Sequence, residues 1–351
     1  MLRAMPDPTP RAPVSNATTR VLAPPMSGVI DPATRTPLQG SFAGPLPPID
    51  YGPLGKSLPF RVAHEKAWYY VAIASPEVFV GVAILRFGYV ASTFAFLFER
   101  APSGGPSGHF LTDRSMLAPP FAARYKGDEG IALRWLGDVC RFERSAGAAF
   151  DLEVAMSGFS IAARIDGAPR PTPISAVTAL GDGLVQATEK RALLPVNGEV
   201  TLAGKRFSLD GALGGFDRSH GYLARHTVWR WSFAMGRAES GEAIAWNLVD
   251  GFVGERECAV WIDDELFPVG EARFHYDLDR ALRPWRITTT CGALDLTFDP
   301  GDIHAEHQDL GLVKTRFLQP VGAYSGTIKI GERTLKLSGV LGVAEDQDAT
   351  W

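Results

Sequence analysis

The sequence predicts an all-β protein, a sandwich or barrel rather than a doubly wound sheet. Short segments rich in aromatic and β-branched residues recur along the chain, separated by Gly, Pro, Ser and Asp, as strands joined by turns are. No long run of residues has the 3.6-residue period of a helix, so helices should be few and short. The pair Asn197-Gly198 lies between apolar residues and is the strongest short-range signal of a hairpin.

The composition of the first 58 residues predicts that they form a flexible or extended segment. The stretch "MLRAMPDPTPRAPVSNATTR" is interrupted by four prolines and has no apolar run of the kind found in secretory signals. Proline and glycine stay frequent up to Leu58. Such a composition buries little apolar surface, so we expect this segment to lie over the fold as extended chain.

The rest of the chain is predicted to form two domains. Its 351 residues exceed the length of roughly 250 to 300 residues at which a single core stops growing. The glycine-rich stretch "DGALGG" at 210–215 marks the boundary. We therefore expect an N-terminal β domain over 59–210 and a C-terminal β domain over 211–351, each an antiparallel barrel or sandwich.

Three further strand pairs follow from local patterns. The run 78–98, "VFVGVAILRFGYVASTFAFLF", is long enough to span a membrane, but Arg86 near its middle would cost roughly 2.5–3.5 kcal/mol there. Its Val, Ile and Phe content instead favours two buried strands with a turn at or near Gly88. "TTTCGALDLTF" and "IKIGERTLKLSG" predict two more hairpins.

Composition limits the partners and the compartment. With 46% hydrophobic residues, 21% charged residues and a formal charge of -4, the chain is typical of globular proteins and has no basic field for nucleic acid. The cysteines Cys140, Cys258 and Cys291 are odd in number and far apart, which suits reduced thiols. We expect a cytoplasmic location and no nucleic acid partner.

Familiar cofactor and hydrolase motifs are incomplete. "GPLGKS" resembles the end of a phosphate-binding loop, but Asp50 stands where the first glycine is required. "DRSHG" resembles a hydrolase nucleophile elbow, but Asp217 replaces its leading glycine. No G-x-G-x-x-G motif follows a strand. We expect no cofactor.

A metal site is weakly indicated in "DIHAEHQDL". On a strand, His304 and Glu306 share one face, while His307 and Asp309 share the other. Each face offers one imidazole and one carboxylate, whereas a catalytic zinc usually has three protein ligands. The ordinary alternative is a polar edge strand or loop with solvated charges, and we assign no metal ligand.

An aromatic strand provides the candidate ligand-binding residues. If 225–235 is a strand, one face carries Arg225, Thr227, Trp229, Trp231, Phe233 and Met235. This face could be ordinary sheet core or the wall of an apolar cavity. For the second alternative we assign Arg225, Trp229, Trp231 and Trp246 as ligand-binding residues.

Polar residues upstream and at the C-terminus provide the candidate catalytic groups. The segment "FDRSHGYLAR" is expected at a mouth or corner of the sheet, where Asp217 and His220 could transfer protons. Alternatively, Asp217 pairs with Arg218 or Arg225 and His220 packs as a neutral residue. Glu345 lies near the expected end of the last strand and is either a third acid or solvated, with Trp351 as a plug of the barrel.

Several blocks of sequence carry a resemblance to a known family. They are "GGFDRSHGYLARHTVWRWSFAMG", "WNLVDGF", "RPWRITT", "LDLTFDP" and "LSGVLGVAEDQDATW". In order and spacing, these blocks resemble the family called domain of unknown function 2804, over about 61–351. More distantly, the chain resembles the lipocalin-like group of carotenoid 1,2-hydratase (hydroxyneurosporene synthase) and tocopherol cyclase. This resemblance implies two successive lipocalin-like units acting on long isoprenoid molecules without a redox cofactor.

Two functional hypotheses follow. The first is binding of a lipophilic small molecule, lipid or isoprenoid-like, in a β cavity whose polar corner fixes the head group. The second is a cofactor-independent hydratase, cyclase or isomerase, in which Asp217, His220 or Glu345 donates a proton and aromatic faces stabilise the resulting cation. A scaffold role is the third alternative. The expected partners are the lipophilic molecule and, transiently, a membrane.

Overall fold

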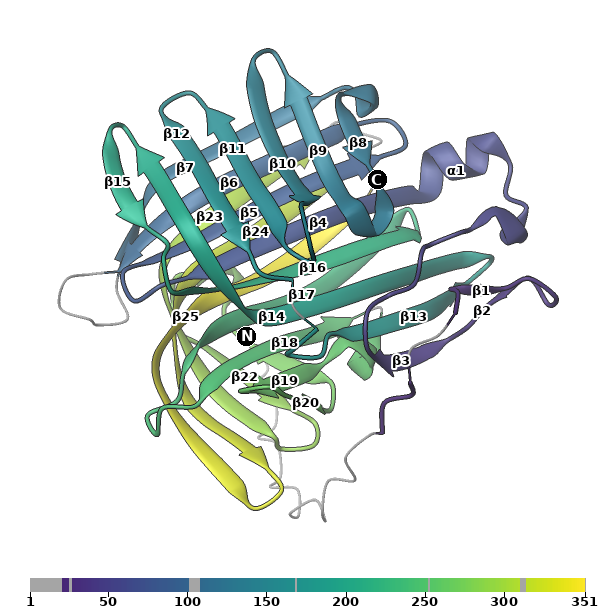
Figure 1. Ribbon diagram of the computed structural model, residues 1–351. Coiled ribbons are helices and arrows are strands. Elements are labelled where there is room, and N and C mark those ends of the chain that lie inside the picture. Colours follow the sequence, from purple (N-terminus) through teal and green to yellow (C-terminus); the bar gives the residue numbers. More distant parts are fainter. Residues whose placement is uncertain are drawn as a thin grey trace, which may run out of the picture.

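The prediction of an all-β fold is confirmed. The computed structural model describes residues 21–24, 27–100, 108–167, 169–251, 253–309 and 314–350, and only the backbone of 108–113 and 308. Within these residues there is one α-helix, α1 (Leu58–His64), and five short 3₁₀ turns. Most of the remaining residues belong to two large antiparallel sheets that follow each other in the chain (Figure 1). Trp351, expected as a plug, lies outside the described residues.

The first sheet has fourteen strands and curls into a nearly closed barrel. Its main path runs β7-β6-β5-β4-β16-β14-β12-β11-β10-β9-β8. The strands are β3 (Gly40–Ala43), β4 (Glu65–Ala74), β5 (Val78–Phe87), β6 (Ala91–Arg100), β7 (Gly108–Ala118), β8 (Ala123–Tyr125), β9 (Gly130–Trp135), β10 (Asp138–Arg144), β11 (Phe150–Met156), β12 (Phe159–Ile165), β13 (Ile174–Gly181), β14 (Leu184–Leu202), β15 (Lys205–Ser208) and β16 (Ala212–Tyr222).

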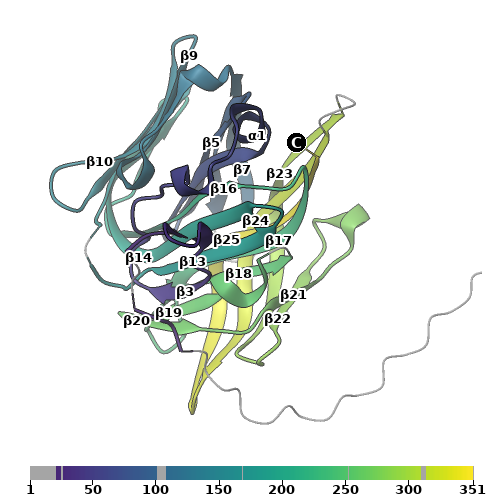
Figure 2. The same ribbon diagram turned by 90° about the vertical axis from the view of Figure 1, so that its right-hand side faces the viewer.

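The second sheet has nine strands and forms a half barrel that packs against the first (Figure 2). Its order is β20-β19-β18-β17-β25-β24-β23-β22-β21. The strands are β17 (His226–Arg237), β18 (Ala243–Gly251), β19 (Ala259–Ile262), β20 (Glu265–Pro268), β21 (Ala272–His275), β22 (Trp285–Thr289), β23 (Leu294–Asp309), β24 (Lys314–Ile330) and β25 (Arg333–Thr350).

The chain passes from the first sheet to the second between Tyr222 and His226. Strand β16, which begins just after the predicted boundary at 210/211, pairs with β4 and β14 of the first sheet. The chain therefore leaves the first sheet after residue 222, later than the predicted boundary. The division into domains at 210/211 stays a prediction.

The described part of the N-terminal segment packs on the first sheet. It contains the short strands β1 (Ile30–Asp31) and β2 (Thr36–Pro37), and β3 pairs with β13. Leu46 and Tyr51 are buried, and the Tyr51 hydroxyl donates a hydrogen bond to the carbonyl of His220 (2.6 Å). This segment thus covers part of the first sheet and adds a small apolar cluster.

Strands β4 to β6 are buried on both faces. In β4, Tyr69, Val71 and Ile73 belong to the core inside the first sheet, whereas Tyr70, Ala72 and Ala74 belong to the core between the two sheets. A strand buried on both sides is apolar at consecutive positions, which explains the uninterrupted run 78–98. The predicted turn at Gly88 is confirmed. No helix among the described residues is long and apolar enough to cross a bilayer.

Two of the three predicted hairpins form. The turns at 290–293 and 331–332 join β22 to β23 and β24 to β25. The turn predicted at Asn197-Gly198 is wrong, because β14 continues straight through it. Gly198 has a φ of 139°, and a Cβ there would lie 2.2 Å from the carbonyl oxygen of Ala162. Gly198 lets the backbone of β14 approach β12 closely. The glycine is therefore needed for this approach and not for a turn.

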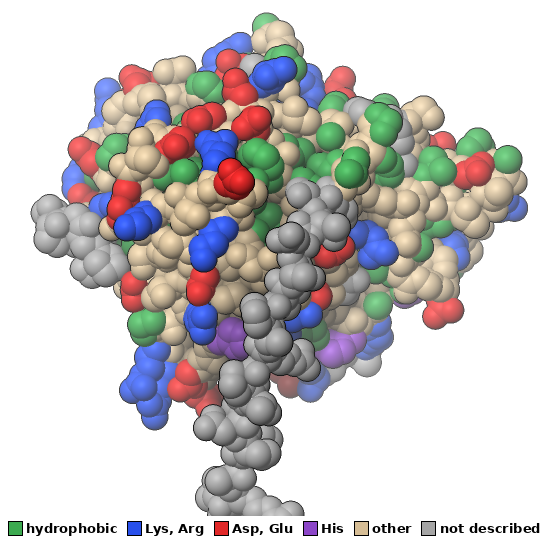
Figure 3. All heavy atoms as spheres, turned by 90° about the horizontal axis from the view of Figure 1, so that it is seen from below, with side chains coloured by type: hydrophobic (Ala, Val, Ile, Leu, Met, Phe, Trp, Pro, Cys, Tyr) green, Lys and Arg blue, Asp and Glu red, His purple; other side chains and the backbone are tan. Residues whose placement is uncertain are grey.

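The surface carries charges of both signs. On the face shown in Figure 3, Lys and Arg side chains are interspersed with Asp and Glu side chains. This arrangement agrees with the small formal charge of -4. This face therefore has no large field of a single sign.

Candidate functional site

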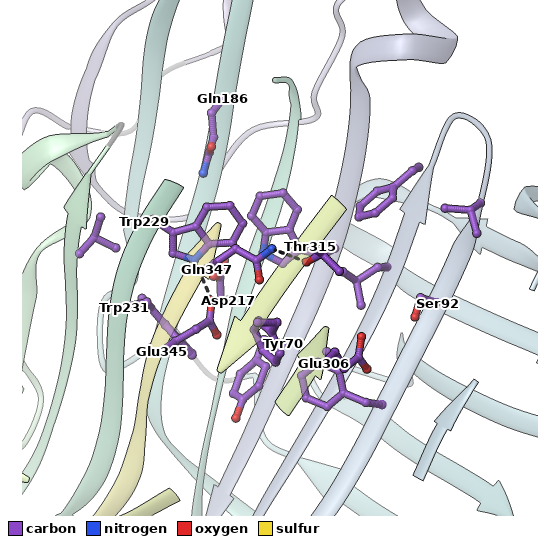
Figure 4. Close-up of a pocket in the computed structure, with 18 of the residues that line it drawn as sticks. Tyr70, Ser92, Gln186, Asp217, Trp229, Trp231, Glu306, Thr315, Glu345 and Gln347 are labelled. Atoms are coloured by element: carbon purple, nitrogen blue, oxygen red, sulfur yellow. Dashed lines mark hydrogen bonds between the residues drawn. The ribbon is translucent and has the colours of Figure 1, made fainter. Parts of the chain in front are cut away.

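A cavity of about 200 Å³ lies between the two sheets. One wall comes from β4, β5 and β6, and the facing wall comes from β17, β24 and β25. Most of the lining is aromatic or aliphatic, and the aromatic residues are Trp68, Tyr70, Phe87, Tyr89, Phe94, Trp229, Trp231 and Phe317. Buried polar side chains also line it, and they are Gln186, Lys190, Asp217, Glu257, Glu345 and Gln347. Figure 4 labels Gln186, Asp217, Glu345 and Gln347 among them.

The predicted aromatic strand forms part of this wall. Trp229 and Trp231 alternate on β17 and therefore point to the same side. Trp231 stacks on Phe233, with ring centroids 5.6 Å apart, and donates a hydrogen bond to Asn247 Oδ1 (2.8 Å). Trp229 lies parallel to Trp68 across the sheets, with centroids 6.3 Å apart. The two indoles are thus held in fixed orientations.

The structure places two other candidate ligand-binding residues away from the cavity. Trp246 on β18 is fully buried, donates a hydrogen bond to Ser232 Oγ (3.0 Å) and packs against Tyr324. Arg225 is exposed in the link between β16 and β17. Neither side chain lines the cavity.

A buried group of charges lines the cavity around Lys190. Its ammonium lies 2.6 Å from Asp217 Oδ1 and 3.0 Å from Glu257 Oε2. Lys190 on β14 stands directly opposite Asp217 on β16. Burial disfavours the charged lysine, but the two carboxylates outweigh this effect and raise its pKa. Burial also raises the pKa of Glu257, against the opposing influence of Lys190.

Sequence reasoning missed Lys190 and Glu257. The segment "TEKRA" looks like a solvated run of charges, yet it lies inside a β14 strand that is buried along most of its length. The sequence did contain a signal that these charges are buried. The triplet at 189–191 lies between the apolar segments "LVQA" and "LLPV", and a strand with such apolar flanks is seldom exposed. Glu257 ends the 3₁₀ turn η4 (Gly254–Glu257), and no local pattern distinguishes it.

Glu345 lies within the cavity wall and not at the end of a strand. The expectation of a solvated acid near a strand end is wrong, since β25 continues to Thr350 and Glu345 is 6% exposed. Its two oxygens accept hydrogen bonds from Trp229 Nε1 (2.7 Å) and Gln319 Nε2 (2.8 Å). Burial raises the pKa of Glu345 to about 7, although these hydrogen bonds act in the opposite direction. The carboxyl can therefore hold or release a proton near neutral pH.

His220 is not part of this cavity. The segment predicted as a mouth or corner is the central strand β16, paired on both sides, so that prediction is wrong. Successive side chains of a strand face opposite ways, so His220 lies on the other face from Asp217. Its Nε2 lies 3.2 Å from Glu65 Oε1, and burial lowers its pKa despite that carboxylate. Arg218 pairs with Glu189 on this far face, and Asp217 pairs with Lys190 instead.

The histidines considered for a metal lie on β23. His304 is buried, 3.4 Å from Glu306 Oε1, and packs against Phe94. Asp309 is exposed and pairs with Lys314 (2.8 Å). Among the residues that the structure describes, no group of three or more His, Cys, Asp or Glu is placed to hold a metal ion.

The fold and the site define a β protein with an internal cavity between two successive antiparallel sheets. A family model described as "Domain of unknown function (DUF2804)" matches residues 50–351. The chain belongs to this family, which confirms the resemblance found in the sequence.

No curated protein matches the sequence, and the solved structures that resemble this chain include the following three. Kievitone hydratase from Nectria haematococca is 12% identical, covers 82% of this chain and 89% of its own, and has a TM-score of 0.49. CghA is 13% identical over 81% of this chain and 88% of its own, with a TM-score of 0.49. CghA with Sch210972 is 12% identical over 82% and 89%, with a TM-score of 0.48.

Proposed function

We propose that this protein binds a lipophilic small molecule in the cavity between its two sheets. The observation that carries this proposal is a cavity of about 200 Å³ with a mainly apolar, aromatic lining and a few buried polar groups. This combination is typical of small-molecule sites. Burial of apolar surface supplies roughly 25 cal/mol per Å², and the polar groups orient the ligand.

Loss of Trp231 should weaken binding. The variant Trp231→Ala removes a buried indole from the cavity wall, and we expect ligand affinity to fall about tenfold or more, which corresponds to at least 1.4 kcal/mol. The measurement is native mass spectrometry of protein purified without detergent, followed by lipid extraction and by titration with the molecule recovered.

Two further variants complete this test. Leu85→Trp fills the cavity from β5 without opening a hole in a core, so it should block binding even if Trp231→Ala folds poorly. Trp135→Ala removes an indole that lies outside the cavity and packs on Phe121, and it should leave binding unchanged. Full retention of ligand by both cavity variants would rule out this cavity as the site.

A second function, acid catalysis on the same ligand, is favoured by Glu345. Hydration, cyclisation or isomerisation of an alkene without a cofactor begins with proton donation. Glu345 lines the cavity with a pKa raised to about 7 by burial, and the indoles of Trp229 and Trp231 could stabilise a developing cation. Asp217 is held by Lys190, so Glu345 is the better proton donor.

Deuterium transfer would test this second function. Protein incubated in D₂O with the recovered ligand should add deuterium to a ligand carbon, and Glu345→Gln should abolish this exchange while still binding. His220→Gln should keep the activity, because His220 faces away from the cavity. Binding without any exchange by the unmodified protein would leave ligand binding as its function.

A further inference from the structure

The buried polar groups of the cavity limit which head group a ligand can present. We propose that this part of the cavity selects a ligand whose polar end donates hydrogen bonds and carries no negative charge, a hydroxyl or an amine, and that it rejects carboxylates. The inference rests on the proposed binding function and deepens it. It follows from the hydrogen bonds and charges of the described residues.

Most hydrogen-bond donors around Lys190 already have a partner, whereas the hydroxyl of Tyr89, elsewhere in the lining, has none among the described residues. Lys190 donates to Asp217 and Glu257. The Gln186 amide donates to Glu257 Oε1 (3.3 Å). Trp229 and Gln319 both donate to Glu345. A ligand carboxylate, which only accepts hydrogen bonds, would be limited here to the remaining N–H groups of Lys190 and Gln186. These lie beside the carboxyl groups of Asp217 and Glu257, which would repel it.

An acceptor, by contrast, is open. The oxygen Oε1 of Gln186 is buried, and it has no hydrogen-bond partner among the described residues. A buried acceptor without a partner costs free energy of the order of 1–3 kcal/mol. Gln186 lines the cavity, so a hydroxyl or amine of the ligand could supply the missing hydrogen.

The charges point the same way. The buried lining carries the carboxyl groups of Asp217, Glu257 and Glu345 against one ammonium, that of Lys190. An additional anion would meet an excess of acidic groups in a poorly solvated site, where uncompensated charge is costly. A neutral donor avoids this cost, and a cation would offset the excess.

Other charged groups near the cavity do not reverse this balance. Glu306 and Lys314 also line it, and Lys314 is exposed and pairs with Asp309. Lys66 lies over the rings of Phe87 and Tyr89, at 5.5 and 5.6 Å from their centroids, and is not itself part of the lining. Burial also lowers the pKa of Lys66 to about 8, so it is a weaker cation than an exposed lysine.

Three probes with the same alkyl chain test the inference. Decanol, decylamine and decanoic acid would be titrated at pH 8 by calorimetry, with tryptophan fluorescence as a second readout. We expect the alcohol and the amine each to bind at least tenfold more tightly than the acid. Equal or tighter binding of decanoic acid would overturn the inference and leave lipophilic binding intact. Failure of all three probes to bind would count against the binding function, and the inference would fall with it.

Variants then locate the selectivity. Glu257→Gln removes one buried carboxylate and should reduce the preference for the alcohol over the acid by threefold or more. Glu199→Gln removes a carboxylate that lies outside the cavity and pairs with Arg206, and it should not change the preference. Gln186→Leu removes the open acceptor, so it should weaken the binding of the alcohol and of the amine, and it should leave the binding of the acid unchanged. Unchanged preferences in both Glu257→Gln and Gln186→Leu would contradict the assignment.

Discussion

Replacement of Lys190 by methionine is expected to lower the free energy of unfolding by about 3–5 kcal/mol. Lys190 is 2% exposed, and its ammonium is the shared partner of Asp217 and Glu257. Methionine fills a similar volume but leaves two buried carboxylates without a cation. Their charges then repel each other and remain poorly solvated. Urea denaturation at pH 7 would measure this loss.

An exposed ion pair gives the matched control. Lys314 lies 2.8 Å from Asp309, and both side chains are more than half exposed. Lys314→Met should therefore change stability by about 1 kcal/mol or less. The double variant Lys190→Met/Glu257→Gln should recover part of the loss, because one of the two carboxylates is then neutral. A loss below about 1 kcal/mol in Lys190→Met would mean that the buried charges do not depend on this lysine.

The Glu345→Gln variant is expected to remove a pH dependence of stability. The pKa of this carboxyl rises from 4.5 to about 7 on folding, mainly through burial. The folded state thus binds the proton more tightly, so stability is undiminished below pH 4.5, falls as the pH rises, and is lowered in full above pH 7. At 1.36 kcal/mol per pKa unit, the difference is about 3 kcal/mol.

The measurement compares unfolding free energies at pH 5 and pH 8. Unmodified protein should lose more stability over this interval than Glu345→Gln does, and the difference between the two curves isolates Glu345 from other buried groups. Glu306→Gln, with its partly exposed side chain, should follow the unmodified protein. Parallel curves for Glu345→Gln and the unmodified protein would mean that this carboxyl does not take up its proton on folding.

Much of the fold could be predicted because strands and turns are encoded locally. The apolar segments on either side of Gly88 and the turns at 290–293 and 331–332 follow from neighbouring residues alone. The prediction of a turn at Asn197-Gly198 failed for a physical reason. The positive φ of Gly198 serves a close approach to Ala162 in another strand, and no local pattern reveals such an approach.

The site was predicted only in part, because its polar residues depend on pairing between distant strands. Trp229 and Trp231 were found because alternation along one strand fixes their common face. Asp217 and Glu345 were predicted as candidate acids. Lys190 was missed because its position opposite Asp217 depends on the register between β14 and β16, which the local sequence does not reveal. His220, three positions from Asp217 on the same strand, lies on the opposite face. The charged residues at 189–191 resemble an exposed segment, because such residues are usually found at the surface, and Lys190 was therefore not among the candidates.

Strands β4 to β6 form a common partition between the two apolar interiors of the molecule. Each apolar core uses one face of these strands. A cut of the chain that assigns the strands to one core would therefore leave the other core exposed on one side. An added Cβ at Gly81 would meet the ring of Phe96 at 2.4 Å and the hydroxyl of Tyr70, which lines the cavity, at 2.7 Å. Bulk introduced within the partition thereby becomes a means of altering the shape of the cavity.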